Sequence, residues 1–364
     1  MIVINRIPVF QKRRLLLFVL ISTTAWLVAS CGHPVSVWGS DKESIASDAS
    51  ITFFVLGDPS AHDDFLPRMV ENIAKDKPDF VLIAGDCVTH WKDQQQWDDF
   101  FGIFAPLNQP PTRLYAVPGD RDTSYGGEGL RQGIKNWQTQ WDLPGNEIYY
   151  SISQESLYVV GLMSNLNTLS YSSPAIKGLK PQLAWLKEDL EVNASSAKWK
   201  IAFHHEPGGR FTRLSDPVDG GFGVGVSGMI EPLLIRAGVD LIIRGQHHFY
   251  ERTYPISVKT GKRDENRGVT FISTGGGSRD FVPRNMADAD PLWFDAVIAT
   301  HRIHYCKCII AGDNLTWEAI DLNGNTFDRF EIIKQPNGQR KWIGLPVTGK
   351  LLTKQTRNSP LEER

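Results

Sequence analysis

Residues 51–60 read ITFFVLGDPS, an apolar run that ends in a polar cluster at Gly57 and Asp58. Four more polar clusters follow apolar runs along the chain: GDCVT (85–89), GDRD (119–122), HH (204–205) and GQHH (245–248). Short apolar runs of this kind are typical of buried strands. Because ligands of open α/β sheets bind beyond the carboxyl ends of the strands, we predict that the five clusters converge on one site.

Strand and helix patterns alternate after residue 51, and strands alone follow toward the end of the chain. Apolar residues at helical spacing predict helices within 63–77, 93–104, 180–191 and 229–238. Further strands are predicted within 113–117, 147–153, 157–163, 268–274, 304–312, 315–322 and 327–333. This order predicts an α/β fold, a layered sandwich with two sheets, in one domain over residues 51–335. Residues 336–364 show no period and are predicted to form a flexible extension.

The charge of the chain argues against one class of partner. Its 364 residues include 39 Lys and Arg and 41 Asp and Glu, which gives a net charge of −2. The basic residues are scattered, and a net charge near zero does not attract a protein to nucleic acid. We therefore expect no nucleic-acid partner.

Residues 1–30 have the pattern of a targeting segment. Basic residues at 6 and 12–14 precede an apolar run from Leu15 to Ser30, which is short for a membrane span. The run leads into LVASC (27–31), where small residues before a cysteine are typical of a bacterial lipobox. We expect a lipoprotein-type signal peptide over 1–30, lipid on Cys31 and a tether over 31–50. An ordinary signal peptide or an uncleaved anchor is the alternative.

This pattern predicts the location of the protein. A lipid chain on Cys31 would hold it to a membrane of the bacterial cell envelope. The folded domain would then lie on the periplasmic or extracellular face.

The side chains of the five clusters suit a pair of divalent cations. Two ions a few ångströms apart share a carboxylate, hold a phosphate ester and favour in-line displacement by water. Asp58, Asp86 and Asp120 are candidate oxygen ligands, and His204 and His248 are candidate nitrogen ligands. Carboxylates with some imidazole suit Mn, Zn or Fe better than a metal that selects thiolates.

At these clusters the sequence resembles the calcineurin-like metallophosphoesterases, in particular the purple acid phosphatases. The motifs of that family run GDxG or DxH, GDxxY, GNH[D/E], a His before a proline, and GHxH. HHFYERTYPI (247–256), QLAWL (182–186) and the glycines at 275–277 resemble the family outside the metal clusters. The resemblance covers residues 51 to about 333. It implies a four-layer sandwich, two mixed β-sheets flanked by helices, and the hydrolysis of phosphate esters at a dinuclear metal centre.

The resemblance also implies which metal each ligand binds. It places Asp58 and His248 at the first metal and Asp86 between the two metals. Asp120 stands where the family has a second-metal Asn, and Gln246 stands where the family has a second-metal His. The amide of Gln246 would bind zinc more weakly than imidazole does, and the charge of Asp120 would partly offset that loss.

The remaining second-metal histidine has two candidates. His204 matches the family position, and His205 is its rival because the register before Pro207 is one residue longer than usual. By the same resemblance, Arg121, Asp122 and His205 are the candidate catalytic residues.

Two departures from the motifs bear on the chemistry. Thr89 replaces the tyrosine of GDxxY, so we do not expect an iron(III)-tyrosinate centre. Arg121 replaces the histidine of GNH[D/E]. An arginine gives up no proton at working pH but can bind phosphate oxygens through two nitrogens, so esters with good leaving groups, such as aryl esters, should be favoured.

The sequence therefore supports two hypotheses of different classes. The first is a lipid-anchored, metal-dependent phosphoesterase that acts on phosphate esters outside the cytoplasm. The second is a degenerate member of the fold that binds a phosphorylated ligand or a protein partner without efficient hydrolysis, because several motif positions are replaced.

Overall fold

Strand β1 (Ile51–Leu56) lies inside a seven-stranded sheet between neighbours from opposite ends of the chain. It pairs in parallel with β2 (Phe80–Ile83) and antiparallel with β13 (His304–Ala311). The order across this first sheet is β16-β15-β14-β13-β1-β2-β3. Its other members are β3 (Arg113–Ala116), β14 (Asn314–Asp321), β15 (Thr326–Lys334) and β16 (Arg340–Ile343).

A second seven-stranded sheet has the order β12-β8-β11-β7-β6-β5-β4. Its members are β4 (Tyr150–Gln154), β5 (Leu157–Leu162), β6 (Trp199–His204), β7 (Leu241–Arg244), β8 (Tyr250–Thr253), β11 (Thr270–Thr274) and β12 (Ala296–Thr300). The central strands β5, β6, β7 and β11 run parallel, and the outer pairings are antiparallel. Strands β9 (Ile256–Ser257) and β10 (Lys262–Arg263) form a separate short pair.

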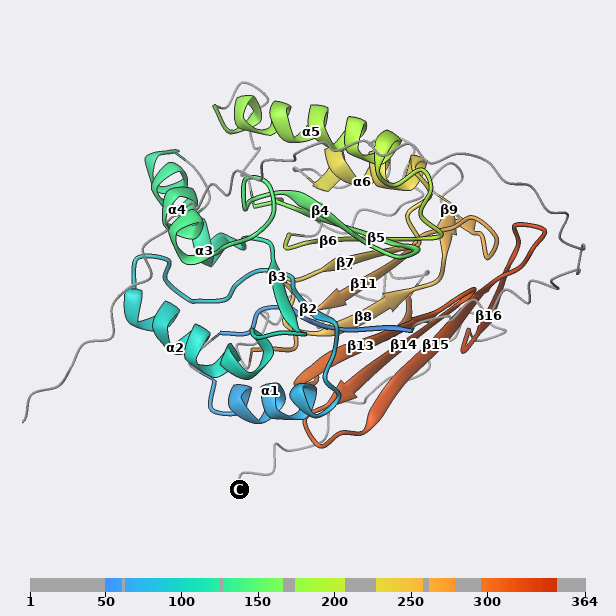
Figure 1. The fold of residues 1–364 in the computed structure, drawn as a ribbon, viewed down its shortest axis with the longest axis horizontal. Helices are drawn as coiled ribbons and strands as arrows, with labels where there is room; N and C mark the ends of the chain where they lie inside the picture. Colours follow the sequence, from blue (N-terminus) through green and yellow to red (C-terminus); the bar gives the residue numbers. More distant parts are fainter. Residues whose placement is uncertain are drawn as a thin grey trace, which may run out of the picture. The chain divides into compact units, whose positions relative to one another are not determined.

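Helices cover the outer faces of both sheets (Figure 1). α1 (Leu66–Lys75) and α2 (Gln94–Phe104) lie against the first sheet, and α5 (Pro174–Val192) and α6 (Ser227–Arg236) lie against the second. The short helix η1 (Ala105–Leu107) leads from α2 to β3, and α3 (Asp120–Thr123) and α4 (Gly127–Gln140) lie between β3 of the first sheet and β4 of the second. The predicted four-layer α/β sandwich with two mixed sheets is confirmed.

This computed structural model describes residues 50–60, 63–124, 127–165, 174–206, 227–257, 262–278 and 296–345, all within one compact unit that begins at Ser47. The predicted signal peptide and tether, with Cys31, lie outside these residues. Within them, no helix is long and apolar enough to cross a membrane. Residues 340–343 form strand β16, so the first part of the extension predicted from residue 336 pairs with the first sheet, and residues 346–364 of it lie outside the described residues.

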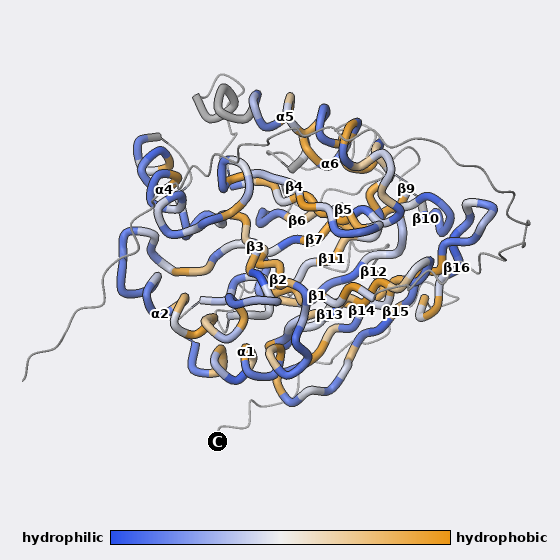
Figure 2. The backbone as a smooth tube through the Cα atoms, viewed as in Figure 1, coloured by the Kyte–Doolittle hydropathy of each residue, from blue (hydrophilic) through white to orange (hydrophobic). Residues whose placement is uncertain are grey.

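Side chains alternate between two layers of the core along the strands of the second sheet. On β6, Trp199, Ile201 and Phe203 enter the core between the sheets, whereas Ala202 faces the core under α5 and α6. Hydrophobic residues accordingly follow the strands of both sheets (Figure 2). This alternation decides which polar side chain at the end of each strand can reach the space between the sheets.

The helices of ten or more residues follow the predicted apolar spacing, with one addition. On α1, the residues Leu66, Met69, Val70 and Ile73 are buried on one face. Helix α4 was not predicted. Its Trp137 is fully buried and meets the ring of Trp97 edge to face, with ring centroids 6.0 Å apart.

A buried ion pair joins the two sheets. Arg252 on β8 donates from Nε and Nη2 to the two carboxylate oxygens of Asp328 on β15, each at 2.7 Å. The hydroxyl of Tyr250 donates to the same carboxylate at 2.7 Å, and the Arg252 guanidinium lies 4.7 Å from the ring centroid of Phe330. The two opposite charges at this junction are therefore paired across the sheets, while Arg252 Nη1 is buried without a hydrogen-bond partner among the described residues.

We expect Arg252→Met to destabilise the protein by about 3–5 kcal/mol, because it leaves the Asp328 carboxylate buried without its cation. Urea unfolding followed by tryptophan fluorescence measures the loss. The double variant Arg252→Met/Asp328→Leu should recover most of it, since an apolar pair replaces the ion pair. A loss below about 1 kcal/mol in the single variant would show that this junction does not support the fold.

Candidate metal centre

Three non-glycine residues at the strand ends have a left-handed backbone. Asp58, Asp86 and Gln246 have φ values of 58°, 57° and 66°. Such values are uncommon outside glycine and gather at functional sites, where the surrounding structure holds them. The amide of Asp58 donates to the carbonyl of Gly85 at 3.0 Å, so the loops after β1 and β2 support each other.

These loops bring potential metal ligands together. One ligand atom from each of Asp58, Asp86 and His205 lies within 4.8 Å of the others. His205 Nε2 lies 3.1 Å from Asp120 Oδ1 and 3.4 Å from Asp86 Oδ1. His248 Nε2 lies 3.3 Å from Asp58 Oδ1. The clusters at the ends of β1, β2, β3, β6 and β7 thus meet, as the sequence predicted.

The structure brings His205 to this cluster and not His204. His204 follows the face of Ala202, and its Nε2 lies 3.3 Å from Glu231 Oε1 on α6. His205, one residue later, turns into the space between the sheets. Its Nδ1 lies 2.8 Å from the carbonyl of Ala84, which accepts its proton and leaves Nε2 to face the carboxylates. His205, the rival of the expected ligand His204, is therefore the one that lies among the carboxylates, because side chains alternate along a strand.

The carboxylates are buried close together, which is costly without a cation. Asp58, Asp86 and Asp120 are 1%, 3% and 8% exposed. Burial raises the pKa of Asp86 well above its usual value; His205 acts against this rise, and Asp120 and Asp58 add to it. Burial would lower the pKa of His205, but these carboxylates outweigh burial and raise it. Divalent cations would supply the positive charge that the site needs.

The unpaired atoms of the site fit metal ions. Within the described residues, the two carboxylate oxygens of Asp58 and the side-chain oxygen of Gln246 are buried and have no hydrogen-bond partner. Buried polar atoms are nearly always paired, so atoms of this kind indicate a missing ligand. Three carboxylates, an amide oxygen and two imidazoles are donors that Mn, Zn and Fe accept.

Asp122 holds the loops that carry the ligands. Its Oδ2 accepts from the amides of Asp86 and Gly119, both at 2.8 Å, and its Oδ1 accepts from Cys87 at 2.9 Å and Val88 at 3.2 Å. Burial raises the pKa of Asp122 to about 6, even though the Gly119 amide lowers it. Both oxygens are thus engaged with the backbone. The structure gives this predicted catalytic residue a positioning role.

Arg121 approaches the cluster from the solvent side. Its Nε lies 3.3 Å from Asp86 Oδ2, and 32% of its side chain is exposed. Its backbone amide also donates to Asp86 Oδ1 at 3.1 Å. Thr89, by contrast, donates its amide and hydroxyl to Gln96 Oε1 at 2.8 and 2.9 Å, so its hydroxyl is directed to α2.

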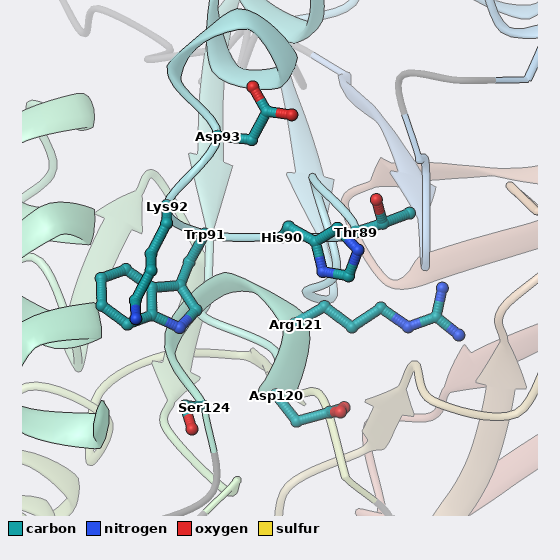
Figure 3. Close-up of a pocket in the computed structure, with 8 residues that line it drawn as sticks. All are labelled: Thr89, His90, Trp91, Lys92, Asp93, Asp120, Arg121 and Ser124. Carbon is teal, nitrogen blue, oxygen red and sulfur yellow. The ribbon is translucent and has the colours of Figure 1, made fainter. Parts of the chain in front are cut away.

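An open cavity of about 620 Å³ lies beside the cluster, between the loop after β2 and helix α3. Its lining residues are Thr89, His90, Trp91, Lys92, Asp93, Asp120, Arg121 and Ser124 (Figure 3). We call it the Trp91 cavity. No pattern in the sequence marks His90, Trp91 or Lys92 as part of a site, although they directly follow the GDCVT cluster.

Fold and site together are those of a layered α/β protein whose potential metal ligands meet at the ends of its strands. Residues 51–250 match the model of the calcineurin-like phosphoesterase family, which is more than half of the chain. The chain belongs to that family.

Several of the curated proteins that it resembles are purple acid phosphatases. Purple acid phosphatase 18 of Arabidopsis thaliana is 27% identical over 250 residues, a match that covers 67% of this chain and 53% of the relative. The chain spans about half the length of the curated relatives that it matches.

Two solved structures share the fold. Purple acid phosphatase PPD1 from yellow lupin (Lupinus luteus) seeds has a TM-score of 0.61 and 18% identity, covering 85% of this chain and 57% of that chain. GAP50, the anchor in the inner membrane complex of Plasmodium, has a TM-score of 0.55 and 16% identity, covering 77% and 87%.

We expect His205→Asn to weaken metal binding at least about tenfold, because the variant removes an imidazole that faces three carboxylates. Inductively coupled plasma mass spectrometry after dialysis against buffered metal measures the content. His204→Asn is the matched control on the same strand and should keep the wild-type metal content. Equal losses in both variants, or a loss in His204→Asn alone, would contradict the assignment.

Proposed function

We propose that this protein hydrolyses phosphate esters at a dinuclear metal centre. The buried carboxylate and imidazole cluster at the strand ends is the single observation that carries the proposal. Membership of the calcineurin-like phosphoesterase family and the purple acid phosphatase relatives support it. The first ion would be held by Asp58, Asp86 and His248, and the second by Asp86, Asp120, His205 and Gln246.

Bound divalent ions would acidify the attacking water and neutralise charge on the phosphate. Mn, Zn or Fe suit the ligand set, and the hydroxyl of Thr89 gives no tyrosinate for iron(III). The choice of Mn, Zn or Fe is part of this proposal.

The residues of the chain supply orientation and charge around the ester. Arg121 lies beside the carboxylate that would bridge the ions, so its guanidinium can bind the phosphoryl oxygens as they gain charge. Asp122 holds the two loops that carry Asp86 and Asp120 at a fixed separation. Because Arg121 donates no proton to a leaving group, esters whose leaving groups need no proton should react fastest.

We also propose that lipid on Cys31 anchors the protein in the bacterial cell envelope. The apolar run and the small residues before Cys31 support this proposal. Metabolic labelling with radioactive palmitate should label the wild-type protein in membranes, and Cys31→Ser should abolish the label. Label that persists in the Cys31→Ser variant would refute the anchor.

We expect Asp86→Asn to lose bound metal and to lower kcat for phenyl phosphate at least about a hundredfold, because the variant removes the negative charge shared by both ions. Asp98→Asn, an exposed position on α2, is the matched control and should keep wild-type turnover. Steady-state kinetics and metal analysis are measured on the same samples. Full turnover in Asp86→Asn would refute the hydrolytic centre.

The degenerate, ligand-binding alternative gives a different result in the same assay. Less than about one bound metal per chain in the wild-type protein, with no hydrolysis of an aryl phosphate in added Mn, Zn, Fe or Ca, would favour that alternative. The replaced motif positions Thr89, Arg121 and Gln246 motivate it.

A further inference from the structure

The Trp91 cavity borders the proposed reaction centre through two residues. Asp120 contacts His205 at 3.1 Å, and Arg121 contacts Asp86 at 3.3 Å. The loop from Thr89 to Asp93 forms the opposite wall of the cavity. An ester whose phosphate lies at Arg121 could therefore place its organic group along this loop.

The wall holds an aromatic ring on a fixed backbone. Trp91 N donates to the carbonyl of Arg121 at 3.1 Å. The carbonyl of Trp91 accepts from Trp97 Nε1 at 3.1 Å and from Asn136 Nδ2 at 2.7 Å. Trp97 is fully buried, so these bonds tie Trp91 to the core of the domain. The half-buried Trp91 ring is thus a preformed surface on which a planar group can stack.

The wall of the cavity carries two acids, Asp93 and Asp120, and two cations, Lys92 and Arg121. Asp93 accepts from Gln95 N at 3.0 Å and Gln96 Nε2 at 3.1 Å, where it caps α2, and Asp120 belongs to the metal cluster. Lys92 Nζ lies 5.0 Å from the centroid of the Trp91 ring. Lys92 lies over the Trp91 ring, and Arg121 points away from that pair (Figure 3). The cavity therefore offers one cation toward the phosphate and another beside the ring.

We propose that the Trp91 cavity is the subsite for the leaving group, and that it selects an aromatic group carrying a second negative charge. The ring of this group stacks on Trp91, and its anionic substituent pairs with Lys92. The assignment rests on the proposed phosphoesterase function, which it extends to a class of substrate. It also agrees with Arg121, since aryl leaving groups need no proton.

Two kinds of measurement test the subsite. The first is kcat/KM for 4-carboxyphenyl phosphate, phenyl phosphate and ethyl phosphate. The second is calorimetric binding of 4-carboxybenzylphosphonate and ethylphosphonate, which contain no ester to hydrolyse, to the metal-loaded protein. Each variant is compared with the wild-type protein on the same compound, which removes differences in intrinsic reactivity.

Trp91→Ala should lower kcat/KM about tenfold for both aryl esters and less than about twofold for ethyl phosphate. Trp91→Phe keeps a ring and should stay within about twofold of the wild-type protein, which separates stacking from a folding defect. Lys92→Met should lower kcat/KM about threefold for the carboxyphenyl ester alone. Lys187→Met, at an exposed position on α5, is the matched control and should change nothing.

The two proposals fail in different ways. If the wild-type protein hydrolyses no ester but binds the carboxybenzyl compound more tightly than ethylphosphonate, and Trp91→Ala removes the preference, the subsite stands and hydrolysis fails. If the wild-type protein is active but Trp91→Ala affects all three esters equally, the subsite is wrong. Equal binding of both phosphonates by the wild-type protein would also overturn it.

Discussion

The repulsion among three buried carboxylates is the constraint around which the site is organised. Asp58, Asp86 and Asp120 lie where three neighbouring strands of the first sheet end, and each is at most 8% exposed. The imidazoles of His205 and His248 lie within 3.4 Å of these carboxylates. Two of the carboxylates, those of Asp58 and Asp86, are carried on a left-handed backbone. The four amide hydrogen bonds of Asp122 keep two of the loops together. Buried charge of this kind persists only where counter-charge is supplied.

The site is positioned in part by strand pairings that involve residues outside the family motifs. The family match ends at residue 250, yet β1 pairs with β13, and β13 with β14, from the last part of the chain. The Arg252–Asp328 pair joins β8 to β15 across the two sheets. The loop after β1 therefore depends on strands that carry none of the motif residues.

Much of the fold and part of the site could be predicted from the sequence. Buried strands can be recognised in the sequence as apolar runs. The convergence of the five clusters could be predicted because each cluster follows such a run, at the end of a strand. The choice between His204 and His205 could not be predicted. The alternation along a strand shows that the two side chains point to opposite faces, but not which face meets the first sheet. Helix α4 has a mixed composition and is stabilised by tertiary packing of Trp137, which is not visible locally. The three residues His90, Trp91 and Lys92 lie in a loop. Their place in the lining of a cavity can be seen only in the folded structure.

If the proposed metal ions bind at Asp58, Asp86 and Gln246, whose backbone is left-handed, the folding equilibrium would depend on the supply of metal. A ligand that binds only the native state stabilises it by RT ln(1 + [L]/Kd), so each tenfold rise in free metal above Kd adds about 1.4 kcal/mol per site. Strain and charge repulsion at the strand ends would be offset by that binding energy. In metal-poor surroundings that contribution would be lost, so metal availability would control the lifetime of the protein as well as its chemistry.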